Sequence, residues 1–408
     1  MTRPTTSALL SPRLLFITGS VLVLLAWTLS PRVGALAGLF DHGRWFLDSQ
    51  AVLAASDAAK AGLNPEAPNP YDAFQRPHSY SDWWFGLGQL GLTRDDNFLV
   101  GGAWVLLFLA AVFLTVRPRS RGEACWLVLL AGSPPVVLGV MRANNDLVIF
   151  AVLAVALVAL RAATWGRLVL AVVAVAAAIG LKFYPVAALM VFLLVRPSRR
   201  MWLVVGAAAL AGGIVLVSVA GQVMRGIFHL EPEIYTMGAR ILLTDLGLAG
   251  NIARPGAVVL LGAAAAVMVW RGWTGGLARD DTASDTRLSM ALAAALLVFC
   301  FLGTVNFGYR WIYALWLAPW CWAKRGESGA ARLMVWLLPA MLWQDAVLCV
   351  ATSLWFPDLG AAQYERIFLV WRLTTQPLAW LVMILLAGWL LELVFARGRE
   401  WRAQAGSV

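Results

Sequence analysis

The sequence predicts an all-α polytopic membrane protein that crosses a lipid bilayer about twelve times. Hydrophobic residues make up 61% of the 408 residues and charged residues only 13%, whereas about 25% of the residues of a soluble domain are charged. Twelve apolar runs are long enough, or almost long enough, to cover about 30 Å of hydrocarbon as helices. These runs begin at Leu14, Phe98, Ala124, Leu147, Leu168, Phe183, Trp202, Ile252, Leu288, Trp311, Leu333 and Phe368. We therefore expect residues 1–408 to form a single transmembrane domain.

The net charge of +10 comes from arginines in short clusters between the apolar runs. With a cytoplasmic N-terminus, all of these clusters fall on the cytoplasmic side, as the positive-inside rule requires. The clusters are Arg117/Arg119/Arg121, Arg161/Arg167, Arg196/Arg199/Arg200, Arg271/Arg279/Arg287, Lys324/Arg325 and Arg397/Arg399/Arg402. We expect an even number of spans and both termini in the cytoplasm. We expect no binding to nucleic acid, because nucleic-acid binders gather basic residues on one face. The preference for arginine over lysine favours a GC-rich bacterial genome, and hence a bacterial inner membrane.

Residues 31–97 are predicted to form the first extracytoplasmic loop, which carries most of the polar residues on that side. The loop is too short for a separate domain and too varied for a simple linker, so we expect short helices that pack onto the membrane domain. Within it, the segment from Trp45 to Leu63 has helical periodicity, and Asp48 shares its face with Val52 and Ala55. An acid on that face is either a charge favoured by the helix dipole or a functional acid with a raised pKa. Periodicity alone leaves both readings open.

The fifth and sixth apolar runs are short, because each has fewer than the roughly 20 residues that a full crossing needs. They are joined by Gly180-Leu-Lys182-Phe-Tyr184-Pro185. We expect two short helices that meet below the outer surface. Backbone broken at that depth is tolerated only inside protein or beside a wet cavity, which makes Lys182 a candidate cavity residue.

Three motifs together resemble a known family. Asp48 is followed by a helix of small residues with Ala55 and Ala58, and then by Gly62, Asn64 and Pro65. Arg142-Ala-Asn-Asn145-Asp146-Leu opens an apolar run, and Lys182-Phe-Tyr184-Pro185 joins two short ones. From Asp48 to Arg196 the chain resembles the polyprenyl-phosphate-sugar-dependent glycosyltransferases of the GT-C superfamily, specifically the alpha-mannosyltransferase-like family 87. It departs from that pattern at Val52, where the family has an aromatic residue, and at Glu66, where the family has tyrosine.

The resemblance implies a fold like that of the GT-C enzymes and an inverting transfer reaction. The donor would be a hexose such as mannose on a polyprenyl phosphate, and the acceptor a lipid or glycan hydroxyl on the outer face of the membrane. Such a reaction needs one general base. Asp48 is the first candidate, and Asp41 is the second because it lies at the exit of the first span. No DxD pattern lies near Asp48 and no His/Asp cluster has metal-ligand spacing, so we expect neither a metal nor a cofactor.

The leaving phosphate gains negative charge, so cations and hydrogen-bond donors should surround it. Lys182, Arg142 and Arg310 are candidates because each is predicted near the outer end of a span. The alternative for the two arginines is that they only reach toward lipid headgroups.

Further candidates for substrate binding are uncharged or weakly basic. They are Asn145, Tyr184, Tyr309 and His78. His78 is otherwise a surface histidine in a structured loop. Asp146 is either a plain helix cap or a substrate ligand.

A transporter or lipid flippase is the competing function, in which Lys182, Arg142 and Asp146 would line a translocation path. The long first loop with its acids and the lack of an internal repeat argue against it. A membrane scaffold without catalysis is the third alternative, and Lys182 argues against it because a buried lysine is costly to hold at depth without a use.

Overall fold

Helices form nearly all of the structure, a computed structural model that describes residues 11–39, 45–64, 67–162, 164–194, 199–226, 232–274, 284–303, 305–356 and 358–405. Within these residues the strands are β1 (Thr236–Met237) and β2 (Asn306–Phe307), which pair antiparallel with Thr236 opposite Phe307. The prediction of an all-α protein is therefore confirmed.

The α-helices are α1 (Pro12–Leu29), α2 (Pro31–Leu36), α3 (Leu47–Lys60), α4 (Gly86–Gln89), α5 (Asn97–Thr115), α6 (Arg121–Ala131), α7 (Pro134–Met141), α8 (Asp146–Ala162), α9 (Trp165–Leu181), α10 (Arg199–Gly226), α11 (Ala239–Asp245), α12 (Gly250–Trp270), α13 (Ser284–Gly303), α14 (Ala314–Lys324), α15 (Gly329–Trp355) and α16 (Ala361–Ala405). Tighter 3₁₀ helices are η2 (Asp82–Phe85), η3 (Arg94–Asp96), η4 (Tyr184–Leu194) and η6 (Gly308–Tyr313).

Seven of the described helices are long and apolar enough to cross a membrane, namely α1, α5, α10, α12, α13, α15 and α16. α6 and α7 pass the same test together, but the chain bends by 57° between them. The protein thus has the architecture of a polytopic membrane protein. The number of twelve spans stays a prediction, because α9 and η4 have only 17 and 11 residues.

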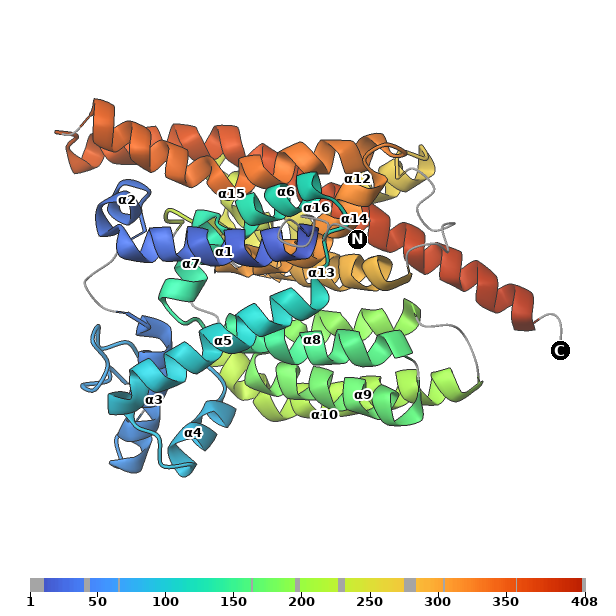
Figure 1. Ribbon diagram of the computed structural model, residues 1–408, viewed down its shortest axis with the longest axis horizontal. Coiled ribbons are helices and arrows are strands. Elements are labelled where there is room, and N and C mark those ends of the chain that lie inside the picture. Colours follow the sequence, from blue (N-terminus) through green and yellow to red (C-terminus); the bar gives the residue numbers. More distant parts are fainter. Residues whose placement is uncertain are drawn as a thin grey trace, which may run out of the picture.

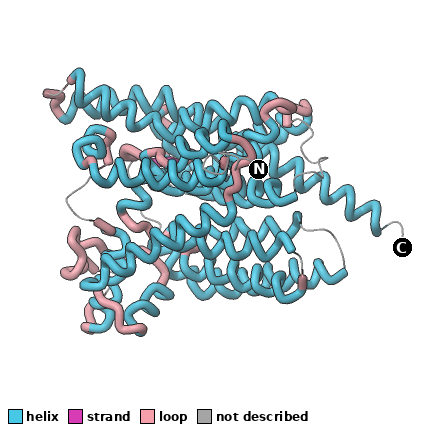
Figure 2. The backbone as a smooth tube through the Cα atoms, viewed as in Figure 1, coloured by secondary structure: helices cyan, strands magenta, loops and turns pink. Residues whose placement is uncertain are grey.

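The long helices run mostly along the length of the molecule (Figure 1). α5, α8, α9 and α10 pack against one another, and α13 lies against α14, α16 and η4. α2, α3 and α4 lie at one end of the bundle, and the last turns of α16 project from the opposite end. Figure 2 shows that much of the loop structure gathers around α3 and α4. This end of the bundle carries the candidate site.

The region between α2 and α5 folds over the helices as short elements with their own apolar core. α3, η2, α4 and η3 contribute, and α3 begins and ends inside the segment that was predicted to be helical. Phe46 has a left-handed φ of 62° and Gly62 one of 73°, so the backbone turns away from helical geometry at both ends of α3. Trp84 packs on Trp104 of α5, and its Nε1 donates to the carbonyl oxygen of Leu181 at the end of α9.

Two glycines let this region approach the membrane helices closely. The ring of Phe46 lies over Gly101 of α5, and the ring of Trp83 lies over Gly180 of α9, where any side chain would clash. By contrast, Gly102, the next residue of α5, faces open space. Small residues at such contacts are what allow tight packing in membrane proteins.

Gly101→Ala should destabilise the protein, whereas Gly102→Ala should not. A Cβ at Gly101 would lie 2.5 Å from the ring of Phe46, and overpacking of this kind costs about 1–3 kcal/mol. Alanine at Gly102 meets nothing and gains helix propensity. Thermal unfolding of both variants in detergent checks this, and equal melting temperatures would contradict the close contact.

Candidate functional site

Asp48 lies in the first turn of α3, where it is buried with 2% of its surface exposed. The backbone N–H groups of Phe46 and Asp48 donate to the carbonyl oxygens of Met141 and Arg142, each over 2.9 Å. The start of α3 thus completes the hydrogen bonding at the end of α7, whose last carbonyl groups have no partner within the helix. This docking points the carboxylate of Asp48 toward the turn between α7 and α8.

Three side chains donate hydrogen bonds to the carboxylate of Asp48. Arg142 binds both oxygens, with Nη2 2.7 Å from Oδ1 and Nε 3.0 Å from Oδ2. Asn144 Nδ2 lies 2.6 Å from Oδ2, and Arg76 Nη1 lies 3.2 Å from Oδ1. A bidentate arginine pair with further donors fixes both the charge and the orientation of a carboxylate.

Arg76 links this carboxylate to a second acid. Its guanidinium donates to both oxygens of Asp72, over 3.0 and 2.8 Å, and to the carbonyl oxygen of Leu47 over 2.7 Å. Arg76 and Asp72 lie four positions apart in the sequence, a spacing at which an acid and an arginine often pair. Asp72 also accepts from the backbone N–H groups of Phe74 and Arg76, which closes the loop around the guanidinium.

The electrostatics keep Asp48 ionised. Burial alone would raise the pKa of the carboxyl, but Arg142, Arg76 and Asn144 outweigh it and lower the pKa to about 2. The reading of Asp48 as an acid with a raised pKa is therefore wrong, because charged partners in direct contact outweigh desolvation. The pKa of Asp72 is also lowered, since Arg76 overcomes the opposing effect of burial.

A second cluster is built around Asp146, at the start of α8. Lys182 Nζ lies 2.6 Å from Asp146 Oδ1 and 2.8 Å from Asn145 Oδ1. Tyr184 donates its hydroxyl to Asp146 Oδ1 over 2.9 Å, and Arg310 Nε lies 3.5 Å from Oδ2. Lys182 directly follows α9, Tyr184 is the first residue of η4, and Arg310 belongs to η6. With the start of α8, four segments of the chain therefore meet at this cluster.

The turn between α7 and α8 serves both clusters. Ala143 has a left-handed φ of 42° and is fully buried, an uncommon conformation for alanine. Asn144 then faces Asp48, whereas Asn145 faces Lys182. Asn144 Oδ1 also accepts from the backbone N–H of Asp146 over 2.9 Å. Asn144 is thus the cap, and the reading of Asp146 as a plain helix cap is wrong.

Tyr80 and Tyr309 lie between the clusters. Lys182 Nζ is 5.5 Å from the ring centre of Tyr80 and 6.0 Å from that of Tyr309. Burial raises the pKa of Tyr80 well above its ordinary value, and the nearby charge of Asp48 raises it further. Tyr80 therefore stays neutral, and both rings lie beside the ammonium of Lys182.

Taken together, the site holds more positive than negative charge. Its cations are Arg76, Arg142, Lys182 and Arg310, and its carboxylates are Asp48, Asp72 and Asp146. Burying charges is costly unless they are paired, and an excess cation at such a place favours an anionic ligand.

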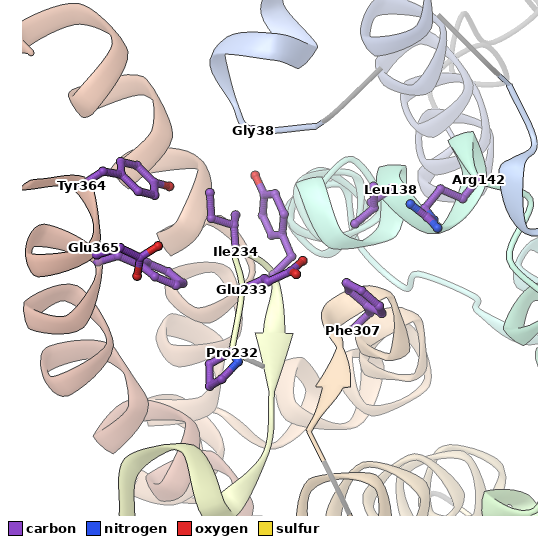
Figure 3. Close-up of a pocket in the computed structure, with 11 residues that line it drawn as sticks. Gly38, Leu138, Arg142, Pro232, Glu233, Ile234, Phe307, Tyr364 and Glu365 are labelled. Atoms are coloured by element: carbon purple, nitrogen blue, oxygen red, sulfur yellow. The ribbon is translucent and has the colours of Figure 1, made fainter. Parts of the chain in front are cut away.

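A cavity of about 390 Å³ opens next to Arg142 (Figure 3). Tyr364 and Glu365 of α16 face Leu138 of α7 and Arg142, the residue after α7, across the cavity, and the segment before β1 crosses between them. The volume lies in the range of small-molecule sites, about 300–1,000 Å³. Since Arg142 holds Asp48 and also lines the cavity, a ligand bound there would lie close to the carboxylate.

The structure brings most of the predicted site residues together. Arg142 lies beside Asp48, while Asn145, Lys182, Tyr184 and Arg310 surround Asp146. Both arginines pair with buried carboxylates, which contradicts the reading in which they only reach toward headgroups. The second candidate base, Asp41, lies outside the described residues, as do Pro65 and Glu66 of the family motif.

His78 packs among aromatic side chains of the first loop. Its ring centre is 4.7 Å from that of Phe85 and 6.1 Å from that of Tyr80, and its Nε2 is 3.8 Å from Asp82 Oδ1. Only 3% of its side chain is exposed, so the reading as a surface histidine is wrong. His78 contacts the site through Tyr80.

Among the described residues, no group of three or more His, Cys, Asp or Glu side chains could hold a metal ion. No protein-family model matches the chain, and neither a curated protein nor a solved structure matches it. The functional reading therefore depends on the geometry of the site and on the motifs of the sequence.

The ion pairs of Asp48 predict how the docked loop responds to acid. A carboxylate with a folded pKa of about 2 and an unfolded pKa of about 3.9 stabilises the fold by about 2.6 kcal/mol above about pH 5, and this stabilisation is lost as the pH falls from about 5 through 2. We expect the acid transition of tryptophan fluorescence in Asp48→Asn to lie at higher pH than in the wild type. The control is Asp57→Asn in the same helix, which should leave the transition in place. An Asp48→Asn transition at the wild-type pH would contradict the depressed pKa.

Proposed function

We propose that the protein is an inverting glycosyltransferase of the GT-C type. It would move a hexose, with mannose as the candidate sugar, from a polyprenyl phosphate to a hydroxyl of a lipid or glycan acceptor. The observation that carries this proposal is the buried carboxylate of Asp48, which is bound by Arg142 and Arg76, together with a cavity of about 390 Å³ that Arg142 also lines. A carboxylate and phosphate-binding cations side by side are the groups that such a transfer needs.

In the proposed reaction, Asp48 takes the proton of the acceptor hydroxyl as its oxygen attacks the anomeric carbon. The bond between that carbon and the phosphate oxygen breaks, and the polyprenyl phosphate leaves with the electron pair. Guanidinium groups match the geometry of a phosphate with paired hydrogen bonds. Arg142 and Arg76 are therefore the groups that bind the phosphate, and they stabilise its growing charge.

Asp48 is a weak base as long as both arginines hold it, since its pKa is about 2. An efficient base has a pKa nearer to the working pH. A donor phosphate would compete for the same guanidinium groups, and each hydrogen bond that it takes raises the pKa of Asp48. Arg76 is suited to this exchange, because 29% of its side chain is exposed and Asp72 keeps it in place. Donor binding would thus activate the base before the acceptor reacts.

The membrane setting of the proposal is a bacterial inner membrane with twelve spans, both termini in the cytoplasm and the site on the outer face. Two observations support it. α1 runs toward the end of the bundle that carries α3 and α4, and α16 runs away from it (Figure 1), which agrees with an even number of crossings. Over the residues that are described, the twelve apolar runs lie mostly in helices. The partners would be a polyprenyl-phosphate-linked sugar, a lipid or glycan acceptor and the surrounding lipids.

A transporter or lipid flippase is the second candidate, and the Asp146 cluster favours it. Lys182, Asp146 and Arg310 form a buried ionic group where α8, α9 and η6 meet, and ionisable groups at such depth often line transport paths. Uptake of sugar phosphate lipids by sealed vesicles, without sugar transfer, would select this function.

Asp48→Asn should abolish sugar transfer while the protein stays folded. Loss of a general base lowers rates by about 10²–10⁴-fold, and asparagine keeps the shape of the side chain. The measurement is transfer of radiolabelled hexose from polyprenyl-phosphate donors to extracted lipids or glycans by purified protein. Asp57→Asn, in the same helix, is the control and should keep full activity. Wild-type turnover by Asp48→Asn would remove the proposed base, and no transfer by folded wild type with any donor would favour the transporter.

Arg76→Gln should weaken donor binding and shift the pH profile. Loss of a charge-assisted hydrogen bond to phosphate raises the KM for the donor by about tenfold or more. Loss of a cation beside Asp48 raises the pKa of its carboxyl, so the acid limb of kcat/KM should move to higher pH. Arg94→Gln is the control, because this exposed arginine stacks on Tyr71 in the same loop. A pH profile and KM like those of the wild type would show that Arg76 is only structural.

A further inference from the structure

A second cavity lies at the opposite end of the bundle from Asp48. Its volume is about 250 Å³, and it lies beside the turn that follows α5. α5 starts near α3 and runs for 19 residues to that turn, which corresponds to about 28 Å at 1.5 Å per residue. The cavity is therefore separate from the site built around Asp48 and Asp146.

Three arginines line this cavity. Arg117 and Arg119 come from the turn between α5 and α6, and Arg161 comes from the last turn of α8. Among the described residues that line it, none is acidic. The nearby carboxylate of Glu123 is buried and accepts from the backbone N–H of Arg119 over 2.7 Å. Three like charges around one small space repel one another, so an anion would stabilise the arrangement.

The other residues that line the cavity include two with hydroxyl groups and a tryptophan that is fixed by its neighbours. Thr286 and Ser289 of α13 line the cavity, and Ser289 Oγ accepts from Arg161 Nη2 over 3.1 Å. Trp316 of α14 forms part of the floor, where its Nε1 donates to Thr115 Oγ1 over 2.8 Å. Its ring stacks on Phe150 with 3.9 Å between ring centres. Cationic and hydroxyl donors on a fixed apolar base are the composition of a phosphate site.

Arginines on the cytoplasmic side of a membrane protein usually determine its orientation in the bilayer, and their side chains stay in water or among lipid headgroups. Arg399, near the end of α16, is exposed in that way. Arg161 differs, because it is partly buried, binds Ser289 and lines a defined cavity. Converging cations between helix ends are a known way of binding phosphorylated headgroups.

We propose that this cavity binds a phosphate group, carried either by an anionic lipid headgroup or by a small soluble phosphate. Water occupies about 30 Å³ per molecule in the liquid, so the cavity has room for one phosphate with part of its hydration shell. The guanidinium groups of Arg117, Arg119 and Arg161 would donate to its oxygens. The site is independent of the proposed transfer reaction and would exist equally in a transporter.

The test is ligand binding to the full-length protein, purified in detergent and stripped of lipid, by native mass spectrometry and by thermal shift. The probes are phosphatidylglycerol, diacylglycerol, which has the same chains without the phosphate, and inorganic phosphate. Phosphatidylglycerol should bind and raise the melting temperature, whereas diacylglycerol should not. Arg117→Gln, Arg119→Gln and Arg161→Gln should each weaken binding about tenfold, the effect of losing one charge-assisted hydrogen bond. Arg399→Gln is the control and should bind as the wild type does.

The probes distinguish the two sources of phosphate. Binding of phosphatidylglycerol that inorganic phosphate does not compete away assigns a lipid, while binding of inorganic phosphate alone assigns a soluble ligand. Either result supports the site if the three arginine variants lose it. Equal binding of phosphatidylglycerol and diacylglycerol, an equal loss in Arg399→Gln, or no binding of either phosphate probe would overturn it. Arg161→Lys keeps the charge and should retain part of the affinity, so it serves if Arg161→Gln does not fold.

Discussion

The contact between the start of α3 and the end of α7 is the interaction on which the candidate site depends. Two backbone hydrogen bonds join the helices, and the bidentate pair of Asp48 with Arg142 lies directly beside them. The N-terminus of one helix thus faces the C-terminus of another, so their dipoles align favourably. The ion pair between Asp48 and Arg142 belongs to this contact, and it binds the loop to the membrane helices. If the pair were broken, one partner would remain buried without its counter-charge, which costs about 3–5 kcal/mol.

The second constraint is the turn at residues 142–146, which divides its polar side chains between two carboxylate clusters. Ala143 is left-handed, and the two residues after it reach different clusters, since Asn144 donates to Asp48 whereas Asn145 accepts from Lys182. Tyr80 and Tyr309 fill the space between, so the clusters form one polar region within an apolar bundle. Beyond Asp146, the hydroxyl of Tyr184 meets that of Tyr313 at 2.5 Å, and the ring of Tyr313 stacks on Phe150. An aromatic column therefore runs from the site into the bundle toward Trp316.

Much of this arrangement was predictable from the sequence. The apolar runs indicated the helices, since a chain with few charges has to bury its backbone groups in helices within a bilayer. The polar motifs at Asp48, at residues 142–146 and around Lys182 indicated the site, because acids and cations at the ends of apolar runs are costly and must find partners. Two of the alternatives that the sequence left open, the headgroup-seeking arginines and the surface histidine, depended on burial and were settled only by the tertiary structure.

Other features could not be predicted, for physical reasons. Arg76 contacts Asp48 across 28 residues of loop, and no local periodicity reports such a contact. The direction of the pKa shift of Asp48 depends on whether its charged partners or its desolvation dominates. That comparison requires the distances from the carboxylate to its partners, which the sequence does not give. The number of spans could not be predicted from the sequence, because short helices such as α9 and η4 are not identified as crossings by their length.

The chain order of the site has a consequence for biogenesis. Asp48 leaves the ribosome well before Arg142, Asn144 and Gly180, and synthesis proceeds from the N-terminus. Until those residues have been synthesised, the carboxylate of Asp48 lacks the partners Arg142 and Asn144, and the ring of Trp83 lacks its packing contact with Gly180. The loop can therefore dock only after α7, α8 and α9 have been inserted. The site is therefore completed later than the segment that carries its carboxylate.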